Sequence, residues 1–315
     1  MNFIKVLAAR INVRRHPDHP ELWLRLGRAY QERAELHRPE TRFLDIVCPD
    51  PTSEVDEPNV VYLDPAPLFF NKAIFAYQRA ISLKPDYAQA WEHLGAAYTQ
   101  QYRRGYWCGD DRLQEGLTQD KQQRLAIAAS AFQQALKIEP DNAVVWNNLG
   151  FVYGQLDRFD DEVSAYRHAL KIKPDDVETW HRLTTVYYNR SQPDKVAQVC
   201  QEAVKNIPLD AHSWYDMGYA NEELGRLKDA AEAYNQARQL DQDFPGPWVR
   251  LGVVYARLGR VEDAVRVYSD VIEWNAKQRN KFWLAISDLK RTEQGEAVLR
   301  HLKSRYPEFM SKQRL

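Results

Sequence analysis

Tryptophan recurs at a fixed interval through much of the chain, and this interval limits the possible folds more than any other feature. Trp180, Trp214 and Trp248 each lie 34 residues after the preceding member of a series that starts at Trp146. Each tryptophan begins a stretch with apolar residues at helical spacing, and a second such stretch follows it. Neither predicted helix is long enough to be stable alone in water. The period therefore predicts helix pairs that complete one another's core in a repeat array.

Residues 143–176 show the repeat most clearly, with the sequence AVVWNNLGFVYGQLDRFDDEVSAYRHALKIKPDD. In the first predicted helix, Gly150 occupies a position where two helix backbones can approach closely. Pro174 ends the second predicted helix. The same pattern continues without interruption in three further repeats, at 177–210, 211–244 and 245–278. The first of these has Thr184 where glycine is usual.

Two repeats nearer the N-terminus are interrupted between their helices. The first covers residues 20–86 with an insertion at about 36–68, and the second covers 87–142 with an insertion at about 102–122. Six prolines oppose helix in the first insertion, whose RFLDIV and NVVYL segments could pair as a small hairpin. The second insertion is expected to begin as a loop and to end as an extension of the following helix.

The two ends of the chain depart from the full repeat. Residues 1–19 resemble the second half of a repeat, because a predicted helix is closed there by Pro17, and we expect an N-terminal capping half-repeat. Residues 279–315 keep apolar positions but lose the period, which is typical of a degenerate repeat and a C-terminal cap with one solvated face.

Composition and charge exclude several classes of function. Among 315 residues, 43 Lys plus Arg balance 44 Asp plus Glu, and the formal net charge is −1. This balance argues against nucleic acid as a partner, and no apolar run approaches the roughly 18 residues of a membrane-spanning helix. Cys48, Cys108 and Cys200 lack CxxC spacing, which favours a reducing compartment. We therefore expect a cytoplasmic protein without membrane insertion.

The repeated residues resemble the tetratricopeptide repeat, whose 34-residue signature is W-x2-L-G-x2-Y followed by A-x3-F/Y-x2-A-x4-P. The resemblance covers residues 20–278. It implies an all-α, right-handed superhelical solenoid of helix-turn-helix repeats, here with two insertions in the N-terminal half. It also implies a scaffold without a cofactor, whose first helices line a concave groove for a peptide or partner helix.

The resemblance also implies which side chains line that groove, since positions 2, 5, 6, 9, 12 and 13 of each first helix face it. The predicted peptide-binding residues are Asn147, Asn148, Phe151, His181, Arg182, Tyr188, Asn189, Tyr215 and Tyr219. Charged or polar residues at equivalent positions are Gln155, His212, Asp216, Glu222, Glu223, Arg250 and Arg257. Amides can bond to a peptide main chain, and aromatic rings offer apolar area at small entropic cost. The alternative is that these residues form only a solvated face.

One known binding mode of the family does not fit this sequence. The carboxylate clamp that holds acidic chaperone tails would use the positions of Glu92, Ala96, Asn148, Glu178 and Arg182. Only Asn148 and Arg182 match, and two acidic residues oppose a ligand carboxylate. We therefore do not expect this chain to bind an acidic chaperone tail.

The sequence predicts a non-catalytic adaptor that binds another protein, and two alternatives stay open. One is a self-assembling scaffold, in which the cap of one chain docks in the groove of another. The other is an enzyme or metal site hosted by the insertions, where Cys108 would need a base such as His93. No GxGxxG, P-loop, HExxH or GxSxG motif and no metal-ligand spacing supports it. Cys200 replaces the usual aromatic residue of a second helix and is assigned to the core.

Overall fold

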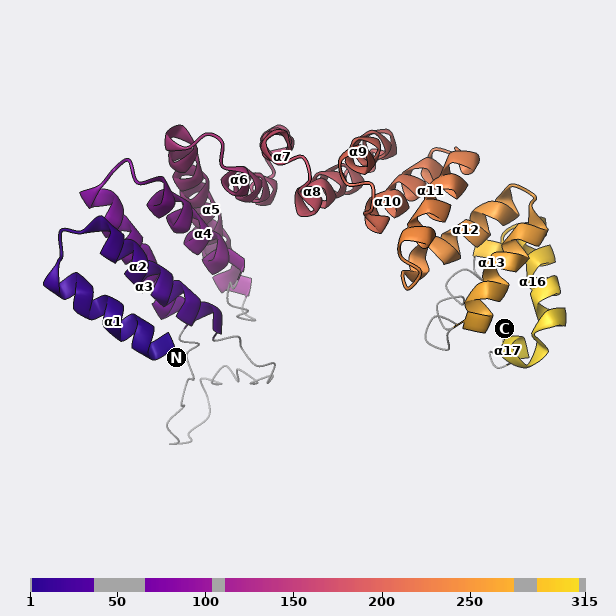
Figure 1. The fold of residues 1–315 in the computed structure, drawn as a ribbon, viewed down its shortest axis with the longest axis horizontal. Coiled ribbons are helices and arrows are strands. Elements are labelled where there is room, and N and C mark those ends of the chain that lie inside the picture. The colour runs from indigo at the N-terminus through magenta and orange to yellow at the C-terminus, as the bar shows by residue number, and fades with distance from the viewer. Residues whose placement is uncertain (1, 37–65, 104–110, 275–287, 312–315) are drawn as a thin grey trace. The chain divides into compact units, whose positions relative to one another are not determined.

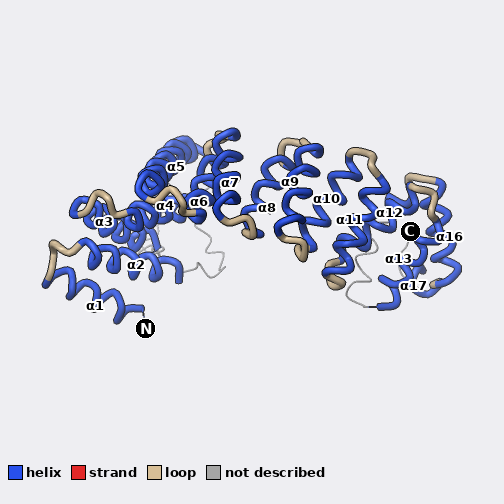
Figure 2. Tube along the Cα trace, turned by 45° about the horizontal axis from the view of Figure 1, so that its top comes forward, coloured by secondary structure: helices blue, strands red, loops and turns tan. Residues whose placement is uncertain are grey.

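The computed structural model describes residues 2–36, 66–103, 111–274 and 288–311. Every regular element in these ranges is a helix, as Figure 2 shows. The predicted all-α repeat fold is therefore confirmed. The hairpin predicted from RFLDIV and NVVYL lies outside the described residues, as do Cys48 and Cys108.

The chain divides into two compact units, which we describe separately. The N-terminal unit, Met1–Ile172, contains α1 (Asn2–Arg15), α2 (Pro20–Leu36), α3 (Ala66–Leu83), α4 (Ala88–Arg103), α5 (Asp111–Ile138), α6 (Ala143–Gln155) and α7 (Phe159–Ile172). The C-terminal unit, Lys173–Leu315, contains α8 (Val177–Tyr188), α9 (Pro193–Asn206), α10 (Ala211–Glu223), α11 (Leu227–Leu240), α12 (Pro245–Arg257), α13 (Val261–Trp274), α16 (Glu293–Arg305) and α17 (Pro307–Ser311).

Within each unit, a helix packs on the helix that follows it, as the ribbon in Figure 1 shows. First helices of successive repeats also touch, so that α2 contacts α4, α4 contacts α6, α8 contacts α10 and α10 contacts α12. At the N-terminal end α1 packs on α2, and at the C-terminal end α16 packs on both α12 and α13. The helix α5 begins at Asp111, so the end of the second insertion extends a second helix, as expected.

The tryptophan period has a structural cause that the sequence pattern does not reveal. Each indole N–H donates a hydrogen bond to the carbonyl six residues earlier, just past the end of the preceding helix. Five of these bonds end on proline carbonyls at 2.7 to 3.0 Å, from Trp23 to Pro17, Trp91 to Pro85, Trp146 to Pro140, Trp180 to Pro174 and Trp214 to Pro208. In the sixth repeat Trp248 uses the Gln242 carbonyl at 3.2 Å. The tryptophan thus fixes the turn between repeats while its ring packs between helices.

Glycine in the first helix makes room for an aromatic ring of the second helix. A Cβ atom built on Gly150 would lie 2.7 Å from Cε1 of Tyr166, a ring that is almost completely buried. The same relation joins Gly27 to Tyr77, Gly95 to Phe132, Gly218 to Tyr234 and Gly252 to Tyr268. The glycine is therefore required for helix packing because of the facing ring, which corrects the expectation of a close approach between two helix backbones.

The repeat at 177–210 departs from this pattern on both helices at once. Thr184 stands in place of glycine, and Cys200 stands in place of the ring. Both are buried, and Thr184 Oγ1 lies 3.8 Å from Cys200 Sγ. The larger first-helix residue is therefore matched by a smaller second-helix residue. Burial raises the pKa of the Cys200 thiol to about 12, which suits the predicted core role and opposes thiolate chemistry.

Candidate protein-interaction surface

The predicted binding residues fall in both units. Asn147, Asn148 and Phe151 lie on α6 of the N-terminal unit, and the others lie on α8 and α10 of the C-terminal unit or directly after α8. Together with α12, these two helices form a surface that we call the C-terminal first-helix surface. It carries the pocket described next, so the site is built from this unit.

One pocket, of about 310 Å³, lies in the N-terminal unit and is described in a later section. A second pocket, of about 270 Å³, lies on the C-terminal first-helix surface. We call the latter the tyrosine pocket. It is lined by Tyr188, Ser191, Gln192, Pro193, Val196, Tyr219, Ala220 and Glu223. The rings of Tyr188 and Tyr219 lie 5.4 Å apart and are tilted by 47°. Tyr188 is 50% exposed, so a large part of its ring is free to contact a ligand.

Two neighbours hold Tyr219 in place within the pocket. A side-chain hydrogen bond with Tyr188, followed by burial, raises the pKa of Tyr219 to about 12. The Arg250 guanidinium lies 5.4 Å from the centre of the Tyr219 ring, within the range of a cation–π contact. Tyr219 is therefore a fixed wall of the pocket, and Tyr188 is its more accessible wall.

Glu222 is buried, which corrects the prediction that it faces an open groove. Only 7% of this residue is exposed. Its Oε1 accepts a hydrogen bond from Arg257 Nη1 at 3.0 Å, and its Oε2 accepts one from the Tyr234 hydroxyl at 2.9 Å. Arg250 Nη1 lies 3.7 Å from the same Oε1 and 3.5 Å from Asp288 Oδ2. This network connects α10 to α11 and α12, and its charged groups pair with one another within the protein.

His181 has a structural partner as well. Its Nε2 lies 2.9 Å from Asp210 Oδ2, and the same oxygen accepts a hydrogen bond from the Ser213 backbone N–H at 2.7 Å, which caps α10. The hydrogen bond to Asp210 raises the pKa of His181. Burial alone would raise the pKa of Asp210, but hydrogen bonds from His181 and Ser213 hold it at about 2. The pair joins the start of α10 to the middle of α8.

Tyr215, one of the predicted peptide-binding residues, is half-buried and belongs to an aromatic cluster. The Tyr215 ring lies 5.0 Å from Phe244 and 5.6 Å from Tyr234. A Cβ atom on Gly246 would come within 2.9 Å of this ring, so a bare backbone covers part of it. His212 stacks on the other end of the cluster, 4.6 Å from Phe244. Tyr215 therefore supports the packing of α10 on α12, and burial raises its pKa.

The carboxyl of Asp216 has a pKa raised toward neutrality. Burial raises its pKa to about 6, although the nearby His181 and His212 act in the opposite direction.

The remaining predicted residues differ in exposure. Arg182 pairs with Glu178 at 2.5 Å, which further weakens the carboxylate-clamp interpretation, and Asn189 is exposed at the C-terminal cap of α8.

In the N-terminal unit, Phe151 packs against a buried cluster around Leu149 and Val152, and Asn147 and Asn148 are half-buried. His93, the base that an active Cys108 would need, stacks on Tyr77 at 5.5 Å. Burial lowers the pKa of His93 to about 4.

Among the described residues no group of three or more His, Cys, Asp or Glu side chains is placed to hold a metal ion. None of the described helices has both the length and the apolar character needed to cross a bilayer.

Sequence reasoning missed the loop side of the tyrosine pocket. Ser191, Gln192 and Pro193 line it, but they follow the first helix and so fall outside the six groove positions. A signal is present in the sequence, since Pro193 opens α9 at a position where proline is favoured. Ser191 has a φ of 53°, a left-handed conformation that glycine adopts in the two following repeats, at Gly225 and Gly259.

Comparison with known proteins agrees with the repeat structure. A family described as TPR repeat matches residues 70–101 and 218–259. Families described as tetratricopeptide repeat match residues 131–163 and 246–278. No curated protein sequence matches the chain.

Several solved structures are similar to the chain at low sequence identity. The crystal structure of YrrB, a TPR protein with an unusual peptide-binding site, has 14% identity and a TM-score of 0.45, and the match covers 76% of this chain and 95% of YrrB. MamA from Desulfovibrio magneticus RS-1, from residue 41 to its end, has 20% identity and a TM-score of 0.41, with 57% and 93% covered. A chain of the APC/C hetero-tetramer Cut9-Hcn1 has 15% identity and a TM-score of 0.42, with 90% and 46% covered. The family matches and the repeated helix pairs show that the chain contains tetratricopeptide repeats.

Proposed function

We propose that the chain is a non-catalytic adaptor that binds a segment of another protein on its C-terminal first-helix surface, with the tyrosine pocket as the main contact. The observation that carries this proposal is the half-exposed Tyr188 ring beside the fixed Tyr219 ring at a pocket of about 270 Å³. A pocket of this size accepts one large side chain, and tyrosine walls supply apolar area together with hydroxyl groups.

The charged residues around the pocket favour binding over catalysis. Glu222 is satisfied by Arg257 and Tyr234, and His181 is satisfied by Asp210. These groups hold the helices in register, so the binding surface is preorganised before a ligand arrives. A rigid surface with one accessible aromatic residue suits a short peptide segment that packs a side chain in the pocket against the exposed part of the Tyr188 ring.

Selection from a displayed library of short random peptides on the immobilised full chain tests the proposal. The selected peptides are then measured by calorimetry against the wild type and two variants. Tyr188→Ala removes the accessible ring, and we expect a loss of roughly tenfold or more in affinity. Leu209→Ala is the matched control, because Leu209 is 82% exposed in the same unit and does not line the pocket.

Equal affinity of the selected peptides for the wild type and for Tyr188→Ala would contradict the proposed site. Tyr215→Ala is not suitable as a surface variant, since its ring packs in the aromatic cluster with Phe244. The self-assembling scaffold stays an open prediction, and sedimentation velocity over a range of concentrations tests it. The cytoplasmic location is part of the same proposal.

A further inference from the structure

Helix α1 packs on α2 in the N-terminal unit, as the second helix of one repeat packs on the first helix of the next. In the repeats that follow, a first helix packs on the second helix of its own repeat and touches the first helix of the next. The helix α1 takes the place of a second helix, because it packs on α2 and ends shortly before Pro17, as α7 ends before Pro174. The face shared by α1 and α2 is thus where a further first helix would lie.

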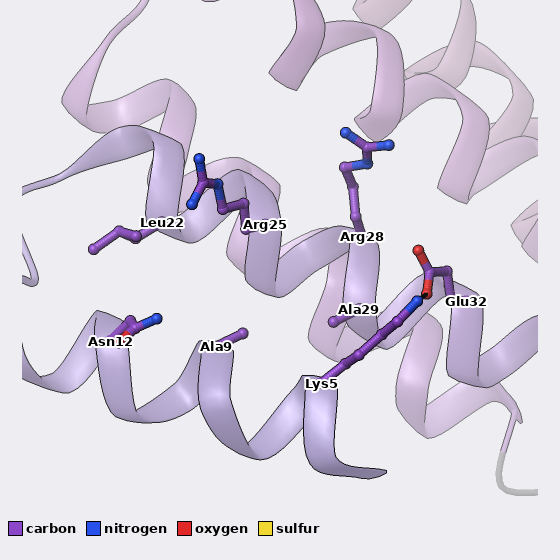
Figure 3. A pocket seen from close by; sticks show the side chains of 8 residues that line it. All are labelled: Lys5, Ala9, Asn12, Leu22, Arg25, Arg28, Ala29 and Glu32. Carbon is purple, nitrogen blue, oxygen red and sulfur yellow. Dashed lines mark hydrogen bonds and ion pairs between the residues drawn. The ribbon is translucent and has the colours of Figure 1, made fainter. Parts of the chain in front are cut away.

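A pocket of about 310 Å³ occupies this place, and we call it the α1–α2 pocket (Figure 3). Its lining residues are Lys5, Ala9 and Asn12 from α1, with Leu22, Arg25, Arg28, Ala29 and Glu32 from α2. Ala9 lies eight residues before Pro17, and Tyr166 lies eight residues before Pro174. Where Tyr166 fills the space against a first helix, the small Ala9 side chain leaves it empty. The pocket therefore lies where the complete repeats have a first helix.

The charges around the α1–α2 pocket are mainly positive. Lys5 Nζ pairs with Glu32 Oε2 at 3.0 Å and closes one end. Arg25 and Arg28 are exposed, and neither forms an ion pair within the part of the chain that the structure describes. Figure 3 shows both guanidinium groups extending to the same side of α2, away from α1. Residues three apart on a helix are neighbours, so the two cations form one site.

The field of Arg28 reaches the next repeat. After burial, Arg28 is the further cause that lowers the pKa of His93 on α4. Its charge also acts on Glu92 of α4, where it opposes the burial that raises the pKa of that carboxyl. The pocket thus combines an apolar floor of Ala9, Leu22 and Ala29 with a cationic rim.

We propose that the α1–α2 pocket binds a helix of a partner protein whose apolar face packs on Ala9, Leu22 and Ala29, and whose carboxylates pair with Arg25 and Arg28. A helix is favoured over an extended segment, since a helix occupies the equivalent place in each complete repeat. A second copy of α1 has the wrong charge for this place, because α1 carries Lys5, Arg10, Arg14 and Arg15 and no acidic residue. Arginine pairs well with carboxylates in two-bond geometry, which gives the acidic helix its specificity.

Two stapled helical peptides test this inference with the full chain. They share one alanine and leucine face and differ only on its flank, where one has two glutamates a turn apart and the other has two lysines. Fluorescence anisotropy should show saturable binding of the glutamate peptide, with an affinity at least about tenfold above that of the lysine peptide. Binding should weaken as salt is added. Arg25→Glu/Arg28→Glu should reverse the preference between the two peptides.

The control variant is Lys195→Glu/Lys228→Glu, which changes the net charge equally in the C-terminal unit. It should bind both peptides like the wild type, and circular dichroism should show that both variants are folded. The inference is wrong if the glutamate peptide does not bind, or if it binds Arg25→Glu/Arg28→Glu as well as the wild type. Full displacement by millimolar inorganic phosphate would indicate a simple anion site and would overturn the helix assignment. Dimers that disappear in Arg25→Glu/Arg28→Glu would show that a second copy occupies the pocket.

Discussion

The two units use one helix-pair scaffold for surfaces of different chemistry. In the C-terminal unit, charged side chains near the first helices are paired inside the protein, as Glu222 is with Arg257, and the accessible group is the Tyr188 ring. In the N-terminal unit, Arg25 and Arg28 stay at the rim of an α1–α2 pocket with an apolar floor. The contrast teaches that the repeat sets the helix positions, whereas ion pairing decides which side chains remain available to a partner.

The largest expected effect comes from a substitution in the repeat at 177–210, where Thr184 and Cys200 replace the usual glycine and aromatic ring. Cys200→Tyr places a ring against Thr184, where other repeats have glycine. Overpacking of this kind should lower the free energy of unfolding by about 3 kcal/mol. The double variant Thr184→Gly/Cys200→Tyr restores the pairing of the other repeats and should recover most of this loss. Urea unfolding measures both, and equal destabilisation of the single and double variants would contradict the packing account.

Removal of the buried carboxylate should have the next largest effect. Glu222→Ala leaves the buried Tyr234 hydroxyl without its acceptor and takes a partner from Arg250 and Arg257. Because both arginines are partly exposed and can be rehydrated, we expect a loss of about 2 kcal/mol in the free energy of unfolding. Glu223→Ala is the adjacent exposed control and should change stability by less than about 0.5 kcal/mol. If Glu222→Ala lowers the free energy of unfolding no more than Glu223→Ala does, the network around Glu222 does not stabilise the fold.

The His181–Asp210 pair predicts a dependence of stability on pH. The pKa of His181 is raised in the folded protein, so its contribution is full below the unfolded pKa of about 6.5 and is lost as pH rises through the folded pKa. Asp210, with a folded pKa of about 2, stays ionised throughout this window. The stability difference between wild type and His181→Gln should therefore be larger at about pH 6 than at about pH 8.5.

Other titrating groups near His181 require a control for this measurement. Asp216 has a folded pKa of about 6 and adds its own loss of stability as pH rises, and His212 lies 5.8 Å from His181 between ring centres. Repeating the comparison in an Asp216→Asn background removes the carboxyl contribution. If His181→Gln lowers the free energy of unfolding equally at both pH values in the Asp216→Asn background, the account of a charged His181–Asp210 pair is contradicted.

The smallest expected effect is at the exposed ion pair of the N-terminal unit. Lys5 and Glu32 are both well exposed, so the pair is screened by water and ions. Lys5→Ala should change the free energy of unfolding by only about 0.5 kcal/mol. The same variant widens one end of the α1–α2 pocket and frees Glu32. It should therefore reduce the free energy of binding of the glutamate peptide by more than it reduces the free energy of unfolding. A larger loss in unfolding than in binding would contradict the distinction between surface and core charges.

The sequence was sufficient to predict the repeat, because periodic apolar residues record which face of each helix is buried. It predicted the tryptophans as packing residues but not their hydrogen bonds to the carbonyls six residues earlier. It also noted Thr184 and Cys200 separately, without showing that they are in contact. Tyr215 and Glu222 were placed on the correct helices, yet their exposure depends on Phe244, Gly246 and Tyr234, which come from elsewhere in the chain. Position within a repeat thus predicts direction, whereas burial requires the neighbours.

The most direct test of the proposed adaptor function is photo-crosslinking from position 188 in the native lysate. Tyr188 is replaced with p-benzoylphenylalanine, which keeps an aromatic ring at the pocket, and Leu209 is replaced in the same way as the control. We expect a defined protein to be crosslinked from position 188 and not from position 209, and a peptide selected on the wild type should compete with it. The same products from both positions, or a product that the peptide does not displace, would contradict the tyrosine pocket as the binding site.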